Sequence, residues 1–139
     1  MTDHTAKTLE QLDGEVLALP EYDSALVLNV YRLRRVPLNE FSVEDLRLMI
    51  GQSLSLEYLM PLALEHLKKN PFVAGDYYPG DLLKNVLGVR GDFWGAAPEL
   101  CREVQIIAQK ALLHLSSLKV IDEIRKDLKE KLNEFGGEA

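Results

Sequence analysis

The stretch "LKVIDEIRKDLKEKLNEFGG", residues 118–137, carries the clearest structural signal in the chain. Its apolar residues recur every three or four positions, at Leu118, Ile121, Ile124, Leu128, Leu132 and Phe135. The residues between them are mostly charged, which is typical of an amphipathic helix with one buried and one solvated face. Gly136 and Gly137 are expected to end this helix.

The same period recurs toward the N-terminus. We expect further helices at about residues 24–35, 43–50, 56–69, 80–87 and 98–115. Ser42 with Asp45 is close to a capping box, Pro98 suits a first helical turn, and Ser117 is expected to cap the last helix.

Two of these stretches leave alternatives open. Residues 26–30 also fit strand alternation, although the helical neighbourhood favours a helix. Pro61 either kinks one helix or begins a second. The sequence predicts an all-α, single compact domain over residues 1–139, with roughly six to seven helices and frayed ends at 1–7 and 136–139.

Composition narrows the class of protein. The 139 residues are 47% hydrophobic and 27% charged, which is ordinary for a globular domain. We expect a cytoplasmic protein, because there is no bilayer-length apolar run and no signal-peptide pattern at the start. The net charge of −6 argues against direct nucleic-acid binding and is compatible with a basic protein partner.

Motifs for catalysis or cofactor binding are not recognisable. His4, His66 and His114 have no metal-ligand spacing, and Cys101 reads as a packed, inert thiol. Neither a glycine-rich phosphate loop nor a nucleophile elbow occurs. We therefore expect no metal, no cofactor and no small-molecule ligand, and the sequence gives no support for an enzyme.

Four arginines gather before and within the capped helices, at Arg32, Arg34, Arg35 and Arg47. They could hold phosphates, which would suit a nucleic-acid reader. Nearby acids argue for internal ion pairs at least as strongly, namely Glu40, Glu44 and Asp45.

The segment "FVAGDYYPGDLL", residues 72–83, combines turn residues with aromatic and acidic ones. Gly75, Pro79 and Gly80 predict a turn, since glycine permits positive φ and proline restricts its own. Asp81 reads as the N-cap or a first-turn charge of the helix that follows. Tyrosines beside carboxylates can anchor and steer a protein partner, whereas Trp94, in a neighbouring loop, is more expected in the core.

The order of three motifs resembles the immunity proteins of bacterial contact-dependent growth inhibition systems. These are "RLR..PL..F..EDLR.MIGQ", then "YL.PLAL", then "YPGDLL", followed by Phe93-Trp94. The similarity runs from about Glu21 to Trp94, and the final helical pair fits the remainder. It implies a cytoplasmic protein that binds the toxic C-terminal domain, commonly a nuclease, of an exported adhesin and covers its active site or substrate-binding surface.

Candidate residues follow from this resemblance and from the loop composition. The candidates for the toxin interface are Asp76, Tyr77, Tyr78, Asp92, Glu21, Tyr22, Asp23, Glu99 and Glu103. The candidates for turns and caps are Gly75, Pro79, Gly80, Asp81 and Ser42. Because a motif shared by a family is poorly placed to select one toxin, "YPGDLL" can equally be a structural turn. A helical adaptor with another partner is the alternative function, and a nucleic-acid-binding regulator is a weaker one.

Overall fold

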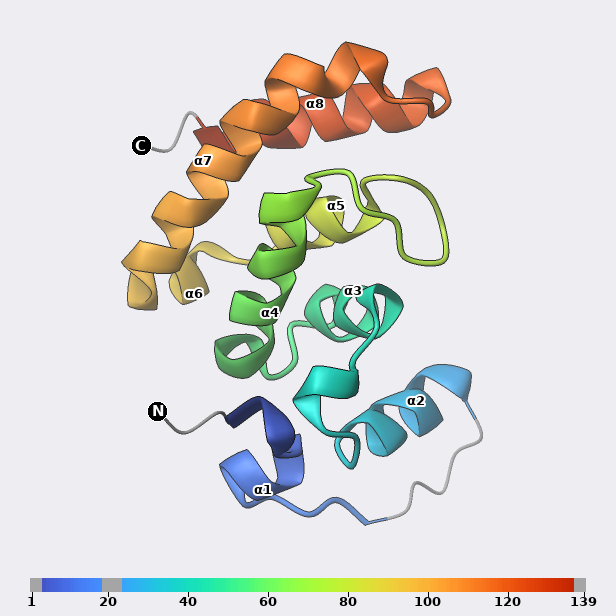
Figure 1. Cartoon of the computed structure of the whole chain (residues 1–139), viewed down its shortest axis with the longest axis vertical. Coiled ribbons are helices and arrows are strands. Elements are labelled where there is room, and N and C mark those ends of the chain that lie inside the picture. The colour runs from blue at the N-terminus through green and yellow to red at the C-terminus, as the bar shows by residue number, and fades with distance from the viewer. Residues whose placement is uncertain (1–3, 19–23, 137–139) are drawn as a thin grey trace.

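The computed structural model describes residues 4–18 and 24–136, and in these residues every regular element is a helix (Figure 1). The α-helices are α1 (Leu9–Asp13), α2 (Ala25–Leu33), α3 (Val43–Gly51), α4 (Leu56–Lys69), α5 (Asp81–Leu87), α6 (Gly91–Ala96), α7 (Pro98–His114) and α8 (Asp122–Gly136). Three short 3-10 helices accompany them: η1 (His4–Ala6), η2 (Leu38–Glu40) and η3 (Leu115–Ser117). The prediction of an all-α fold is confirmed.

Local sequence signals explain several helix boundaries. Ser42 Oγ accepts a hydrogen bond from Asp45 N at 3.1 Å, while Asp45 Oδ2 accepts one from Ser42 N at 2.9 Å, which completes the predicted capping box of α3. Pro98 begins α7 as expected, since its missing N–H costs nothing there. Pro61 lies inside one continuous helix, α4, and does not begin a second.

Other boundaries differ from the prediction. The last helix begins at Asp122, because Leu118–Ile121 is not helical and Ser117 belongs to η3, so Ser117 does not cap it. The guanidinium of Arg125 donates hydrogen bonds to the carbonyls of Leu118 and Val120, which gives this non-helical stretch partners outside a helix. The final helix includes Gly136, and Gly137 lies outside the described residues.

Two short helices were not predicted. Helix α1 is only five residues long, and α6 contains Phe93 and Trp94, which the sequence had suggested lie in a loop. Both are too short for a 3.6-residue period to be visible. The structure also orders part of the expected frayed end, since η1 is helical and Lys7 accepts a hydrogen bond from Leu38 N at 3.0 Å.

The core lies between the central helices α3, α4 and α5 and the antiparallel pair α7 and α8 (Figure 1). Helix α4 contributes five side chains with at most 1% exposure: Leu59, Met60, Ala63, Leu64 and Leu67. Trp94 is buried, as expected for a core residue, and its Nε1 donates to the carbonyl of Val89 at 3.1 Å. Helices α1 and α2 lie at the end of the molecule opposite α7 and α8.

Candidate functional site

The segment between α4 and α5 forms a loop beside α3 and is held by one buried carboxylate. Asp81 is 3% exposed, and its Oδ1 accepts a hydrogen bond from Gly75 N at 2.7 Å. Its Oδ2 accepts from Tyr77 N at 3.1 Å and from Tyr78 N at 3.4 Å. Asp81 is therefore not an N-cap; that position belongs to Gly80, and Asp81, the first residue of α5, binds backward onto the loop.

The two loop glycines serve different purposes. Gly80 has a φ of +96°, a conformation that side chains with a Cβ rarely adopt, so the turn needs glycine there as predicted. Gly75 does not have a positive φ. A Cβ at position 75 would instead lie 2.6 Å from Glu44 Oε1 and 3.1 Å from Asp81 Oδ2. Glycine at position 75 thus allows two carboxylates to approach the backbone.

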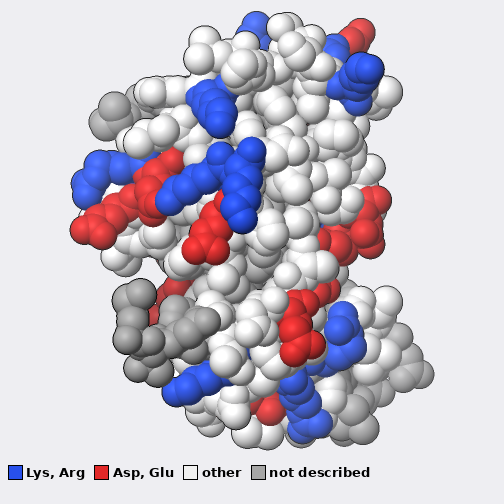
Figure 2. All heavy atoms as spheres, in the orientation of Figure 1, with Lys and Arg blue, Asp and Glu red and all other residues white. Residues whose placement is uncertain are grey.

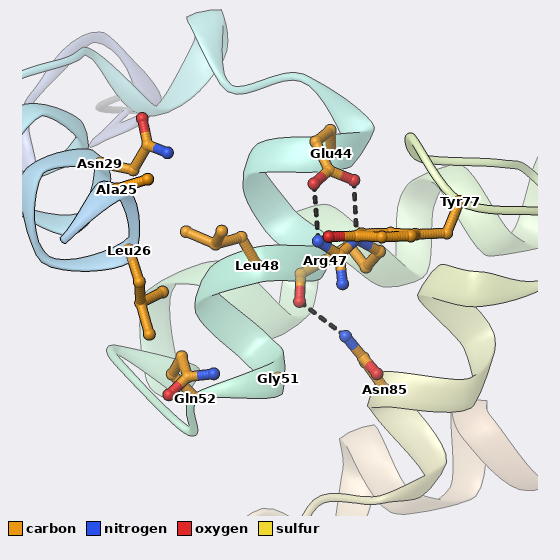
Figure 3. Close-up of a pocket in the computed structure, with 10 residues that line it drawn as sticks. All are labelled: Ala25, Leu26, Asn29, Glu44, Arg47, Leu48, Gly51, Gln52, Tyr77 and Asn85. Atoms are coloured by element: carbon orange, nitrogen blue, oxygen red, sulfur yellow. Dashed lines mark hydrogen bonds and ion pairs between the residues drawn. The ribbon is translucent and has the colours of Figure 1, made fainter.

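A second carboxylate joins the loop to α3. Glu44 accepts hydrogen bonds from Arg47 Nε and Nη2, both at 2.6 Å, and from the backbone N of Asp76 at 2.8 Å. The guanidinium of Arg47 lies 4.3 Å from the centroid of the Tyr77 ring, within the range of a cation–π contact (Figure 3). Tyr77 is nevertheless 70% exposed, so one face of its ring contacts Arg47 and much of the ring is open to solvent.

These contacts change the ionisation of Glu44. The hydrogen bonds from Arg47 are the main cause that holds the pKa of Glu44 below its usual value of 4.5, and the N–H of Asp76 acts in the same direction. Burial opposes them but is the weaker effect. Glu44 therefore stays ionised in the folded protein at neutral pH. On the same loop, the pKa of Tyr78 is raised, chiefly by its burial and also by Asp127.

In Glu44→Gln, the free energy of unfolding should decrease less on acidification than it does in the wild-type protein. A depressed folded-state pKa means that the stabilisation from this carboxylate is present above pH 4.5 and is lost as the pH falls through the folded-state value. We expect the variant to be less stable than wild type at neutral pH, with a smaller further decrease between about pH 5 and pH 3. Urea unfolding across this range measures both quantities. Glu57→Gln, at an exposed position of α4, is the control, and identical pH profiles for the two variants would contradict the assignment.

A groove runs between α2, α3 and the loop, with a volume of about 510 Å³ (Figure 3). Ala25, Leu26 and Asn29 of α2 form one wall, and Tyr77 and Asn85 form the other. The amide of Asn85 donates to the carbonyl of Arg47 at 2.8 Å, which ties α5 to α3 beneath the groove. The wall that contains Asn85 is thus connected to α3.

The candidate interface residues separate into groups. Asp76, Tyr77 and Tyr78 lie together on the loop, where Asp76 and Tyr77 are exposed and Tyr78 is half-buried. Asp92 is an exposed residue of α6, on the side of the molecule away from this loop (Figure 1).

Two further candidates, Glu99 and Glu103, are on α7, where Glu103 forms an ion pair with Lys68. The candidates Glu21, Tyr22 and Asp23 lie outside the described residues.

The clustered arginines are engaged in ion pairs within the protein. Their closest acidic partners are Asp45 for Arg32 at 3.7 Å, Asp13 for Arg34 at 2.7 Å, Glu10 for Arg35 at 3.4 Å and Glu44 for Arg47 at 2.6 Å. Two of these partners, Glu10 and Asp13, were not anticipated. On the face in Figure 2, blue and red atoms also lie side by side without forming one large field of either sign. The arrangement favours internal ion pairing over a phosphate-binding patch.

Sequence reasoning missed the supporting half of this site. Arg47 was named only as a member of the arginine cluster and Glu44 only as one of the acids expected to pair with that cluster, and Asn85 was not named. Glu44 and Arg47 are three residues apart and so share a face of α3. Within the described ranges, no group of three His, Cys, Asp or Glu side chains could hold a metal ion. None of the described helices is both long enough and apolar enough to cross a bilayer.

The structure thus places an exposed, positioned tyrosine beside a polar groove on a helical scaffold. Comparison with known families then names the class: residues 11–104 match the family model described as CDI immunity proteins. The match covers more than half of the chain, and the chain belongs to this family. No curated protein matches the sequence significantly.

Proposed function

We propose that this protein acts in the cytoplasm, where it binds the toxic C-terminal domain of a contact-dependent growth inhibition adhesin and neutralises it. Membership of the CDI immunity protein family is the observation that carries the proposal. The immunity protein would act as a binder and not as a catalyst, by covering the active site or the substrate-binding surface of the toxin.

Charge supports a nuclease as the toxin. A nuclease needs a basic surface to hold phosphates, and this chain has a net charge of −6. An acidic inhibitor is attracted to such a surface and suppresses wrong partners by like-charge repulsion. Asp76 is the loop carboxylate best placed for this purpose, because it is exposed beside Tyr77 while its backbone N–H is held by Glu44.

The loop can combine structural and binding roles. Gly75, Gly80 and Asp81 shape the backbone, and the side chains of Asp76 and Tyr77 project from that backbone to solvent. A shared backbone turn can thus present side chains that differ between family members. Toxin selectivity would then depend on the presented side chains and on the surfaces beside the loop.

The direct test is calorimetry with the toxin domain encoded immediately upstream of the gene, combined with an assay of toxin activity. We expect tight one-to-one binding, loss of toxin activity at equal stoichiometry, and rescue of cells that express this toxin. An unrelated toxin domain serves as the control and should show no binding and no rescue. Absence of binding between two folded partners would overturn the proposed function.

Asp76→Lys should weaken toxin binding about tenfold, mainly through slower association, because exposed charges act chiefly on the rate of encounter. Asp92→Lys is the matched control, since it makes the same charge change at an exposed position on the other side of the molecule. Stopped-flow measurements at two salt concentrations give the association rate constant of each variant with the toxin domain. A larger effect from Asp92→Lys would place the toxin on the α6 side and contradict the loop as the contact.

A further inference from the structure

Helix α2 is far more apolar than its burial requires. Only two of its residues, Asn29 and Arg32, are polar, yet Leu33 is its one buried residue. Leu26, Val27 and Leu28 are 39%, 38% and 40% exposed. A helix that is apolar on most of its circumference is normally covered, so this exposure indicates a surface that receives a partner.

An apolar hollow of about 250 Å³ follows one side of this helix. Leu26, Val27, Val30 and Tyr31 of α2 line it, together with Leu17 and Leu54.

Two exposed apolar residues N-terminal to α2 lie at positions 16 and 17. Leu17, which lines the hollow, is 37% exposed, and the neighbouring Val16 is 69% exposed. Because Leu17 lines the same hollow as the α2 residues, the apolar area there is contiguous and not a scatter of single side chains.

This hollow adjoins the groove beside Tyr77. Leu26 and Gln52 line both of them, so α2 forms a ridge with an apolar side and a polar side. On the polar side, a further depression of about 200 Å³ is lined by Arg32 and by three acids, Glu44, Asp45 and Asp76. Two of these acids already form ion pairs, Asp45 with Arg32 and Glu44 with Arg47. A partner that covers the ridge would thus meet apolar side chains next to the exposed carboxylate of Asp76.

We propose that the toxin domain docks across α2, with apolar side chains in the hollow and a flanking Lys or Arg side chain against Asp76. This inference rests on the proposed function and names the surface and the chemistry of the partner. A second copy of this chain is a poorer occupant, because it carries the same net charge of −6 and so offers no complementary charge. A basic toxin surface has the complementary charge.

The test replaces two exposed apolar side chains of α2 with glutamine. It compares the toxin affinity of this variant with that of a variant carrying two such substitutions on α7. The variant is Leu26→Gln with Val27→Gln, and the control is Ile106→Gln with Leu113→Gln, two residues of α7 that are 68% and 80% exposed. Glutamine is a good helix former, which favours folding of both proteins. We expect the α2 variant to bind the toxin domain about a hundredfold more weakly by calorimetry, and the control to bind like wild type.

A second measurement uses only the wild-type protein and so does not depend on the folding of a variant. Hydrogen exchange with and without the toxin domain should show new protection of the amides of α2 and little change in α7. Light scattering adds the oligomeric state of the free protein. A wild-type dimer that the α2 variant dissociates would make a second copy the occupant and overturn the inference.

The outcomes separate this inference from the proposed function. Tight binding by wild type, with equal affinities for the α2 variant and the α7 control and unchanged exchange in α2, would overturn the docking surface and leave the immunity function intact. Absence of toxin binding by wild type would overturn both.

Discussion

Asp81→Ala should lower the free energy of unfolding by about 3 kcal/mol, because it removes a buried charged acceptor from three backbone donors at once. The carboxylate is 3% exposed and accepts hydrogen bonds from the N–H groups of Gly75, Tyr77 and Tyr78. Alanine would leave these groups without their partner and free the loop from α5. Urea unfolding at neutral pH measures the loss.

The same variant should also lose toxin affinity, since the loop would no longer hold Asp76 and Tyr77 in one arrangement. Asp81→Asn retains one acceptor oxygen and should lose only part of the stability. Asp92→Ala removes an exposed carboxylate of α6 and should change the free energy of unfolding by less than about 0.5 kcal/mol. Equal stabilities for Asp81→Ala and Asp92→Ala would show that the loop does not depend on this carboxylate.

Tyr77→Ala should weaken toxin binding by about thirtyfold or more, the change that corresponds to about 2 kcal/mol for a binding hot spot. The ring is 70% exposed, so its removal should cost the free protein little stability. Its orientation is set in advance by Arg47 beneath it and by Asp81 at its backbone N, which lowers the entropy lost on binding. Calorimetry gives the affinity, and thermal unfolding tests that the variant stays folded.

Tyr77→Phe separates the ring from the hydroxyl group, because it retains the stacking surface over Arg47. Leu113→Ala is the control for loss of an exposed apolar side chain, since Leu113 is 80% exposed on α7. Unchanged affinity of Tyr77→Ala, together with loss of affinity in the α2 variant, would make the loop a structural turn beside the true contact surface. Loss in both would place the loop and α2 in one interface.

Much of the helical framework was predictable, because its signals are local. The period of Leu128, Leu132 and Phe135, the capping pair of Ser42 and Asp45, and Pro98 at a first turn each act within a few residues. The short helices α1 and α6 were missed for the opposite reason, since five or six residues are too few to show a helical period.

The candidate site was predictable only on its exposed side. Tyr77 and Asp76 stood out because aromatic and acidic side chains in a turn need an explanation. Glu44 and Arg47 were expected only as members of an internal ion-pair cluster, with no link to the loop. Their role depends on the backbone of Asp76, a hydrogen-bond partner 32 positions away along the chain.

The helical class, most helix positions and the resemblance to the CDI immunity family can be inferred from the sequence alone, because helical period, caps and motifs are patterns along the chain. The acid that pairs with each arginine, the hydrogen bonds of Asp81 back to the loop, and the exposed apolar side of α2 are visible only in the folded structure. These features depend on how distant helices pack against one another. Packing selects among contacts that the local pattern leaves equally possible.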